Sequence, residues 1–205
     1  MINGFIYLPD YVSEKGQLEL LEAVRRVLVQ SPIFRPTMPR SGRPFSVEMS
    51  NCGTLGWVSS KDGGYRYQAE HPHLQRPWPA IPEALLKIWR DLSGYPEDPE
   101  ACLINWYTAK AKLGLHVDAD EKDTAAPVVS VSLGDDAYFR IGGLKRKDPT
   151  QRLLIKSGDV IVLGGKARLA YHGIDRILPH TSGLMGAPGR FNLTMRRVNN
   201  RAAVV

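Results

Sequence analysis

The sequence is poor in cysteine and contains no long apolar run, and each shortage excludes a class of protein. Cys52 and Cys102 are the only cysteines among 205 residues, too few for a disulfide framework and wrongly spaced for a CxxC zinc site. So few cysteines are typical of a reducing compartment. The sequence contains no run of about 18 apolar residues, the length needed to span a membrane. The N-terminus lacks the basic and apolar segments of a signal peptide. We therefore expect a cytoplasmic protein without a membrane partner.

The rest of the composition is ordinary for a globular domain. Apolar residues make up 43% and charged residues 23% of the chain, and a chain of this length can bury a sizeable core. The formal net charge of +6 allows attraction to polyanions, yet the basic residues are scattered. Charge alone therefore favours a nucleic-acid partner over an ordinary solvated surface only slightly.

Two stretches have the apolar spacing of helices. Residues 13 to 30 form the first, with Ser13 as a cap, and residues 82 to 92 form the second. Proline-rich segments flank the region between them and cannot be helix interiors. Residues 46 to 69 have the composition of short strands, with a turn at "KDGG".

From residue 101 onward, short segments of β-type composition follow one another between Gly and Asp turns. Many short strands at regular spacing predict a sandwich, a barrel or a jelly roll. The last segment, "RFNLTMRRV", alternates strictly between two faces. One face carries Phe191, Leu193 and Met195, and the other carries Arg190, Asn192, Thr194 and Arg196. The polar face is either exposed to water or lines a polar cavity.

The pattern of histidines and acids suggests a metal site. His116 and Asp118 form an H-x-D pair on a predicted strand, and His172 lies on a later one. Two imidazoles and one carboxylate can bind one face of a metal ion and leave three positions open, as in non-haem Fe(II) oxygenases. An H-x-D pair alone is common and means little. His71 and His73, in a proline-rich loop, are interpreted as surface residues.

A predicted anion site gives the triad its context. Arg190 begins the strand that follows His172, and a guanidinium there could neutralise the far carboxylate of a metal-bound 2-oxo acid. Asn105 and Tyr107 share one face of a predicted strand and would add donors. A structural zinc site is less consistent with this pattern, because it would need four protein ligands.

These motifs together resemble the bacterial AlkB family of Fe(II)/2-oxoglutarate-dependent repair dioxygenases. H-x-D-x-D, "VSVSLG", "GGLKR", "GDV", "YHGI" and an R-x-N-x-T-x-R strand occur in the family's order, from about residue 45 to 198. The resemblance implies an α+β, mainly β fold. Its core would be a double-stranded β-helix, or jelly roll, with N-terminal helices and a β-rich nucleotide-recognition lid.

The resemblance also implies a division of the chain and a set of site residues. We expect an N-terminal extension (1–44), a lid with its supporting helix (45–95) and a dioxygenase core (96–200), all in one structural domain. The implied iron ligands are His116, Asp118 and His172. The implied 2-oxoglutarate-binding residues are Asn105, Tyr107, Arg190, Asn192 and Arg196. The implied substrate-binding residues are Met49, Trp57, Tyr65, Asp120 and Arg146, although Arg146 could equally belong to a solvated charge cluster.

Two departures from the family pattern concern the substrate pocket. Leu163 stands where a bulky aromatic residue is expected, so the pocket wall should differ there. The lid has an extra glycine in "KDGGY". Neither change affects an implied ligand, so the expected chemistry is retained.

The expected reaction is oxidative demethylation of 1-methyladenine and 3-methylcytosine in single- or double-stranded DNA, with RNA as a further substrate. It would use Fe(II), 2-oxoglutarate and O₂ and release formaldehyde, succinate and CO₂, and we expect a monomer. Two alternatives stay open: a 2-oxoglutarate-dependent hydroxylase of a protein or small molecule, and a non-catalytic, metal-containing nucleic-acid binding module.

Overall fold

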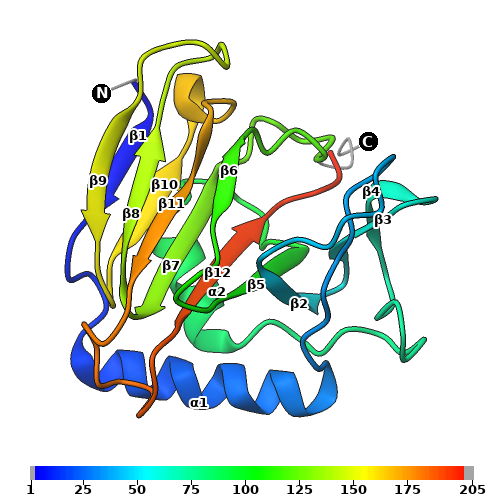
Figure 1. The fold of residues 1–205 in the computed structure, drawn as a ribbon, viewed down its shortest axis with the longest axis horizontal. Coiled ribbons are helices and arrows are strands. Elements are labelled where there is room, and N and C mark those ends of the chain that lie inside the picture. Colours follow the sequence, from blue (N-terminus) through cyan, green and yellow to red (C-terminus); the bar gives the residue numbers. More distant parts are fainter. Residues whose placement is uncertain (1–2, 201–205) are drawn as a thin grey trace.

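Two antiparallel sheets face each other in a computed structural model that describes residues 3 to 200. The larger sheet has the order β1-β10-β7-β12-β5-β2. Its strands are β1 (Phe5–Leu8), β10 (Val160–Leu163), β7 (Val128–Gly134), β12 (Arg190–Arg196), β5 (Ala101–Tyr107) and β2 (Glu48–Gly53). The smaller sheet has the order β6-β11-β8-β9. Its strands are β6 (Leu113–His116), β11 (His172–Leu178), β8 (Asp136–Ile141) and β9 (Gln151–Ile155). This is the expected jelly roll (Figure 1).

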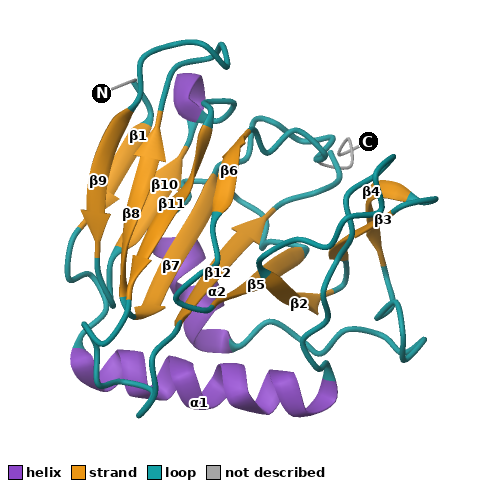
Figure 2. Cartoon of the chain, in the orientation of Figure 1, coloured by secondary structure: helices purple, strands orange, loops and turns teal. Residues whose placement is uncertain are grey.

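Two helices cover the outer face of the larger sheet, and Figure 2 shows α1 running along the base of the molecule. Helix α1 (Glu14–Gln30) is capped as expected, since the Ser13 hydroxyl accepts from the Gly16 amide at 3.3 Å. Helix α2 (Glu83–Leu92) buries Trp89 completely. Both helices thus remove one face of the sheet from water, leaving the other face for a second layer.

Alternate residues of the large sheet serve two different apolar cores. On β10, Val160 and Val162 pack with the helices, whereas Ile161 and Leu163 face the smaller sheet. Strand β12 behaves as its sequence predicts: Phe191, Leu193 and Met195 belong to the helix-side core, and Asn192, Thr194 and Arg196 line an internal cavity. The polar face is therefore turned inward rather than toward water.

A hairpin of β3 (Gly56–Ser60) and β4 (Gly64–Gln68) forms a separate two-stranded sheet beside the jelly roll (Figure 1). Its turn falls in the predicted "KDGG" segment, where Gly64 has a φ of +64°, a conformation that favours glycine. Phe34, Val58 and Trp78 form a small apolar cluster of their own. Val58 of the hairpin thus packs on two aromatic residues outside the hairpin, which helps to hold it on the molecule.

Most predicted strands are present, and the differences are local. The segment 168–174 was expected to be a strand, but β11 begins at His172 within it. Residues 168–171 instead connect β11 to a short 3₁₀ turn, η1 (Gly165–Ala167). Strand β1 lies within the expected N-terminal extension and β2 within the expected lid segment, yet both pair with strands of the core sheet. None of the helices within residues 3–200 is long and apolar enough to cross a membrane.

Candidate active site

The H-x-D pair and the distant histidine of the predicted triad lie side by side at one edge of the smaller sheet. His116 ends β6, His172 begins β11, and the two are register partners in the antiparallel pair. Asp118 follows β6 and lies 3.7 Å from each imidazole, measured from its carboxylate oxygens to the two Nε2 atoms. One ligand atom from each of the three residues fits within a 4.8 Å cluster. The strand pairing therefore assembles two-histidine, one-carboxylate geometry from positions far apart in the chain.

Backbone carbonyls fix which nitrogen of each imidazole faces the cluster. His116 Nδ1 lies 2.9 Å from the Gly114 carbonyl, and His172 Nδ1 lies 3.0 Å from the Ala170 carbonyl. A carbonyl only accepts, so each Nδ1 must carry the hydrogen, and each Nε2 keeps its lone pair. Such outer contacts orient histidine ligands in metal sites. Both Nε2 atoms are therefore ready to bind a cation.

Electrostatics keep the carboxylate ionised. Burial by itself raises the pKa of Asp118, but the positive charge of Arg196 and the neighbouring imidazoles outweigh burial and hold the pKa below its usual value. Burial, assisted by His116, also lowers the pKa of His172 to about 4. An anionic carboxylate and a neutral His172 imidazole at neutral pH are the protonation states that a metal ion requires.

A cavity of about 270 Å³ opens beside the triad between the two sheets and the hairpin. The triad lines it, together with eight of the other site residues expected from the sequence: Asn105, Tyr107, Asn192, Arg196, Met49, Trp57, Tyr65 and Asp120. Leu163, which stands where a bulky aromatic residue was expected, also lines the cavity. Arg190 and Arg146 are not among the lining residues.

Arg190 and Arg146 differ sharply in their surroundings. Arg190 is fully buried, on the same face of β12 as the cavity-lining Asn192, and it is the register partner of Tyr107. Burial lowers its pKa to about 10, which leaves it charged at neutral pH. Arg146 lies on an exposed loop between β8 and β9. The structure thus brings Arg190 up to the cavity wall and leaves Arg146 outside it.

Four buried polar atoms around the triad lack a hydrogen-bond partner within the described residues: Asn105 Oδ1, Asp118 Oδ2, Arg190 Nε and Arg196 Nε. An unpartnered buried polar atom is costly, so such atoms call for a ligand. One carboxylate oxygen beside two imidazole lone pairs suits a divalent cation. Guanidinium N–H groups with no acceptor suit a carboxylate-bearing co-substrate. The residues present therefore fit both a metal ion and 2-oxoglutarate.

The hairpin places aromatic rings at the mouth of the cavity. Trp57 Nε1 donates to Asp120 Oδ2 at 2.7 Å, and its ring stacks on Tyr65 with centroids 5.5 Å apart and an interplanar angle of 24°. Trp57 is buried, whereas the Tyr65 side chain is 52% exposed. An aromatic surface and a carboxylate thus lie beside the candidate metal-binding triad of His116, Asp118 and His172, called the metal-type triad below.

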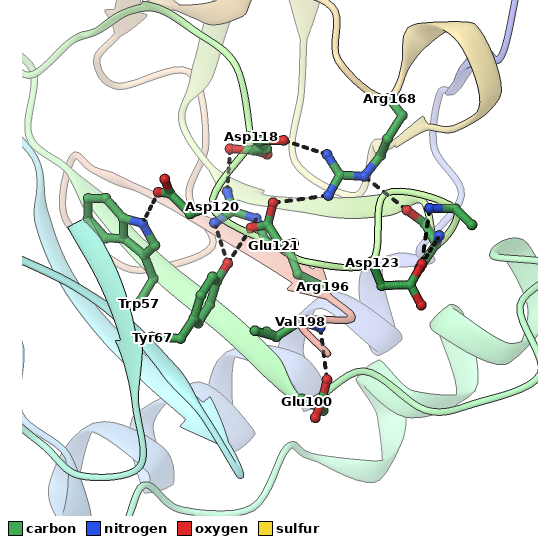
Figure 3. A network of polar contacts seen from close by, with 12 residues as sticks. Trp57, Tyr67, Glu100, Asp118, Asp120, Glu121, Asp123, Arg168, Arg196 and Val198 are labelled. Atoms are coloured by element: carbon green, nitrogen blue, oxygen red, sulfur yellow. Dashed lines mark hydrogen bonds and ion pairs between the residues drawn. The ribbon is translucent and has the colours of Figure 1, made fainter. Parts of the chain in front are cut away.

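Three residues near the triad were not expected from the sequence: Tyr67, Glu121 and Arg168. They surround Asp118 and Arg196 in a buried polar network (Figure 3). Glu121 belongs to the acidic run "DADEKD", whose composition is that of a solvated loop, but its side chain is only 1% exposed. Its partner Arg168 lies 47 positions away. No local pattern links the two residues, so only the fold reveals the pair.

Comparisons with known proteins agree with this geometry. The sequence profile of the 2OG-Fe(II) oxygenase superfamily matches residues 4–196. The alpha-ketoglutarate-dependent dioxygenase AlkB homolog of Caulobacter vibrioides (strain NA1000 / CB15N) is 48% identical, over 96% of this chain and 89% of its own. The alpha-ketoglutarate-dependent dioxygenase AlkB of Escherichia coli (strain K12) is 44% identical, over 89% of this chain and 85% of its own.

A solved structure extends the similarity to three dimensions. The structure of OsALKBH1 superposes with a TM-score of 0.81 at 31% identity, covering 96% of this chain and 99% of that one. The triad, the jelly roll and the match along nearly the whole chain lead to one conclusion. The chain belongs to the AlkB family of the 2OG-Fe(II) oxygenase superfamily and is an Fe(II)/2-oxoglutarate-dependent dioxygenase that uses O₂.

Proposed function

We propose that this dioxygenase demethylates 1-methyladenine and 3-methylcytosine in DNA, single- or double-stranded, with RNA as a further substrate. The observation that carries the proposal is the position of Asp120, at the cavity mouth and hydrogen-bonded to the Trp57 indole. Methylation at adenine N1 or cytosine N3 makes the base cationic near neutral pH. A carboxylate beside an aromatic ring suits such a base.

Base recognition would use the hairpin and the triad edge together. Trp57 and Tyr65 offer ring surface, and stacking contributes on the order of 1–3 kcal/mol per base. Asp120 would accept from the exocyclic amine and offset the positive charge of the base. The methyl group must reach the metal, so the nucleotide must leave the duplex stack or come from a single strand. Met49, on the cavity wall, would limit the depth of the base.

Fe(II), 2-oxoglutarate and O₂, when bound, would supply the oxidation: one oxygen atom of O₂ enters succinate as CO₂ is released, and the other enters the methyl group as a hydroxyl. The resulting hydroxymethyl adduct then releases formaldehyde and leaves the unmethylated base. The chain itself orients the reactants. His116, Asp118 and His172 would hold the iron. Asn105, Tyr107, Asn192, Arg190 and Arg196 would hold the co-substrate.

The arginines divide this work by position. Arg190, buried at the inner end of β12 next to Tyr107, is suited to the far carboxylate of 2-oxoglutarate. Arg196 lies 2.8 Å from Asp118 Oδ1 and is suited to the carboxylate nearer the metal. The two guanidinium groups would thus set the direction of the co-substrate in the cavity.

Several finer features belong to the same proposal. We place nucleotide recognition in residues 45–95 and the chemistry in residues 96–200. We also propose that the enzyme is a cytoplasmic monomer. Arg146, on its exposed loop, would contact nucleic acid outside the cavity, at the phosphate backbone rather than at the base.

Product analysis tests the proposal directly. Purified protein is incubated with Fe(II), ascorbate and 2-oxoglutarate, with and without an oligonucleotide that carries 1-methyladenine or 3-methylcytosine. We expect the methylated strand to stimulate the formation of succinate, and the amount of formaldehyde released to equal the amount of succinate formed. Comparing single- and double-stranded DNA and RNA then ranks the substrates.

The same assay separates the alternatives. Succinate that forms with no formaldehyde from any methylated strand would favour a hydroxylase of a protein or small molecule. Oligonucleotide binding with no succinate at all would favour a non-catalytic binding module. Either result would refute the proposed demethylation.

A further inference from the structure

Tyr67 is the hairpin residue whose side chain enters the buried charge network behind the metal-type triad. It lies on β4, next to Trp57 in the register of the hairpin, and Figure 3 shows its phenol pointing toward Glu121 and Arg196. The phenol donates to Glu121 Oε1 and accepts from Arg196 Nη1 at 3.2 Å. A phenol can do both at once, so Tyr67 connects a carboxylate and a guanidinium from two different segments of the core.

The network leads directly to the predicted metal ligand. Arg196 Nη2 donates to Asp118 Oδ1 at 2.8 Å, and Arg168 Nη1 donates to the Asp118 backbone carbonyl at 2.6 Å. Arg168 Nη2 also donates to Glu121 Oε2 at 3.0 Å. One arginine thus holds the carboxylate of Asp118 and the other holds its backbone. Glu121 lies between the two arginines.

The formal charges of this network cancel, because Asp118 and Glu121 face Arg168 and Arg196. All four side chains are at most 7% exposed. Water can therefore do little to replace a lost contact, and the position of Arg196 depends on its remaining partners. Arg196 Nε lies 3.6 Å from Glu121 Oε1 and has no hydrogen-bond acceptor among residues 3–200. Tyr67 is consequently one of the few contacts that fix the guanidinium.

We propose that Tyr67 is a positioning residue, which couples the hairpin to the metal and co-substrate site through Arg196 and Glu121. The hairpin also carries Trp57 and Tyr65, so the element that would hold the base is tied to the carboxylate that would hold the metal. Removing the Tyr67 hydroxyl should loosen Arg196 and, with it, Asp118. This inference rests on the family's metal and co-substrate chemistry, and its link to the base rests on the proposed function.

The test removes the hydroxyl alone, with Tyr67→Phe. Outer contacts of metal ligands typically change metal affinity or activity by about 10–100-fold. Tyr67 acts one step further out, so we expect Mn(II) affinity of the metal-free protein, measured by calorimetry, to fall roughly tenfold. With Fe(II), the variant should turn more 2-oxoglutarate into succinate than methylated base into formaldehyde, whereas the wild type keeps the two amounts equal.

Tyr95→Phe is the matched control. Tyr95 also donates its phenol to a carboxylate in the acidic run, Asp123 Oδ2, but this carboxylate bonds the backbone of residues 125 and 126 rather than Arg196. A general loss of stability in the 118–123 segment would affect both variants alike. We expect Tyr95→Phe to keep the Mn(II) affinity and the product ratio of the wild type.

The outcomes separate the inference from the proposed function. Equal Mn(II) affinities and equal product ratios in the two variants would refute the positioning role of Tyr67. A wild type that forms no formaldehyde from methylated strands would refute the proposed substrate. In that case a roughly tenfold loss of Mn(II) affinity in Tyr67→Phe alone would still support the coupling to the metal site, and an unchanged affinity would overturn it.

Discussion

The indole of Trp57 donates to the carboxylate of Asp120 across 2.7 Å, although 63 positions separate the two residues. The bond joins the hairpin to the segment that carries the metal-type aspartate. A carboxylate has two oxygens and about four acceptor sites. Asp120 can therefore accept from Trp57 and from a base amine at the same time, so one contact sets both the ring and the acid that would recognise the base.

Asp120→Asn should change the choice of lesion more than the overall rate. The amide keeps its size and an acceptor for Trp57 but loses the negative charge. Hydrogen bonds to charged groups contribute about 1.5–3 kcal/mol, so kcat/KM should fall roughly 10–100-fold for 1-methyladenine and 3-methylcytosine. The neutral lesions 1-methylguanine and 3-methylthymine should lose far less.

The measurement compares the four bases in one oligonucleotide sequence, wild type against variant. An equal loss on all four bases would make Asp120 a support for the metal site rather than a selector of cationic bases. No loss on any base would place it outside recognition altogether.

Asp118→Ala should abolish turnover by removing the carboxylate from the triad. Mn(II) binding, followed by calorimetry, should fall by about 100-fold or more, since one of three protein ligands is lost. The variant should be less stable, since Arg196 loses a buried carboxylate, but it should still fold because Arg196 keeps Glu121 and Tyr67 nearby; circular dichroism checks this. Retained metal affinity in a folded variant would contradict the triad.

Arg190→Lys should raise the KM for 2-oxoglutarate roughly tenfold or more and leave kcat at saturation closer to wild type. Lysine keeps the charge but cannot make the bidentate contact of a guanidinium with a carboxylate. Arg152→Lys is the control, since its side chain is 58% exposed and lies over the Tyr138 ring on the opposite side of the small sheet from the triad's cavity lining. A similar KM for 2-oxoglutarate in both variants would show that Arg190 does not bind the co-substrate carboxylate.

Gly173→Ala should separate the two histidines. A Cβ on Gly173 would lie 2.5 Å from the Leu113 carbonyl oxygen and 2.8 Å from that of Gly114, so β6 would have to move and take His116 with it. We expect a loss of Mn(II) affinity of about tenfold or more. Gly114→Ala, on the facing strand, is the control, because its Cβ would meet no described residue within 4 Å. Matching affinities in the two variants would show that the strands tolerate the extra carbon.

Acidification should destabilise the metal-free protein through His172. Its pKa in the folded protein is about 4, against 6.5 in the unfolded chain, so only the unfolded state gains this proton between those values. Stability should thus fall as the pH drops from 7 to 5, with about 2 kcal/mol of the loss due to His172. Urea unfolding of wild type and His172→Gln measures this difference. Parallel losses in both proteins would mean that His172 does not titrate in this way.

Much of the site could be predicted because its residues are encoded by local alternation. The two-residue period of β12 indicated correctly that Arg190, Asn192 and Arg196 share a face, and the H-x-D spacing placed two triad members together. The pairing of β6 with β11 required the resemblance to a known family, since periodicity does not say which strands are neighbours.

The residues that escaped prediction act at long range. Arg168 reaches Glu121 and the Asp118 backbone from a turn before β11, and its sequence surroundings have no distinctive pattern. Strand β1 was missed because four residues at a sheet edge give little periodic signal. The site's outer contacts thus depend on tertiary packing, which propensity and spacing do not describe.

In each strand of the large sheet, alternate residues face the cavity or the helices, so odd- and even-numbered positions have different roles. On β12 the cavity residues have even numbers and the helix-side residues odd ones, and on the neighbouring β5 the assignment is reversed. Deleting Phe191 from β12 would exchange the two sets beyond that point. It would turn an arginine and an amide toward the apolar helices and two apolar side chains toward the metal site. Insertions and deletions should therefore be confined to the loops, however freely single substitutions occur in the strands.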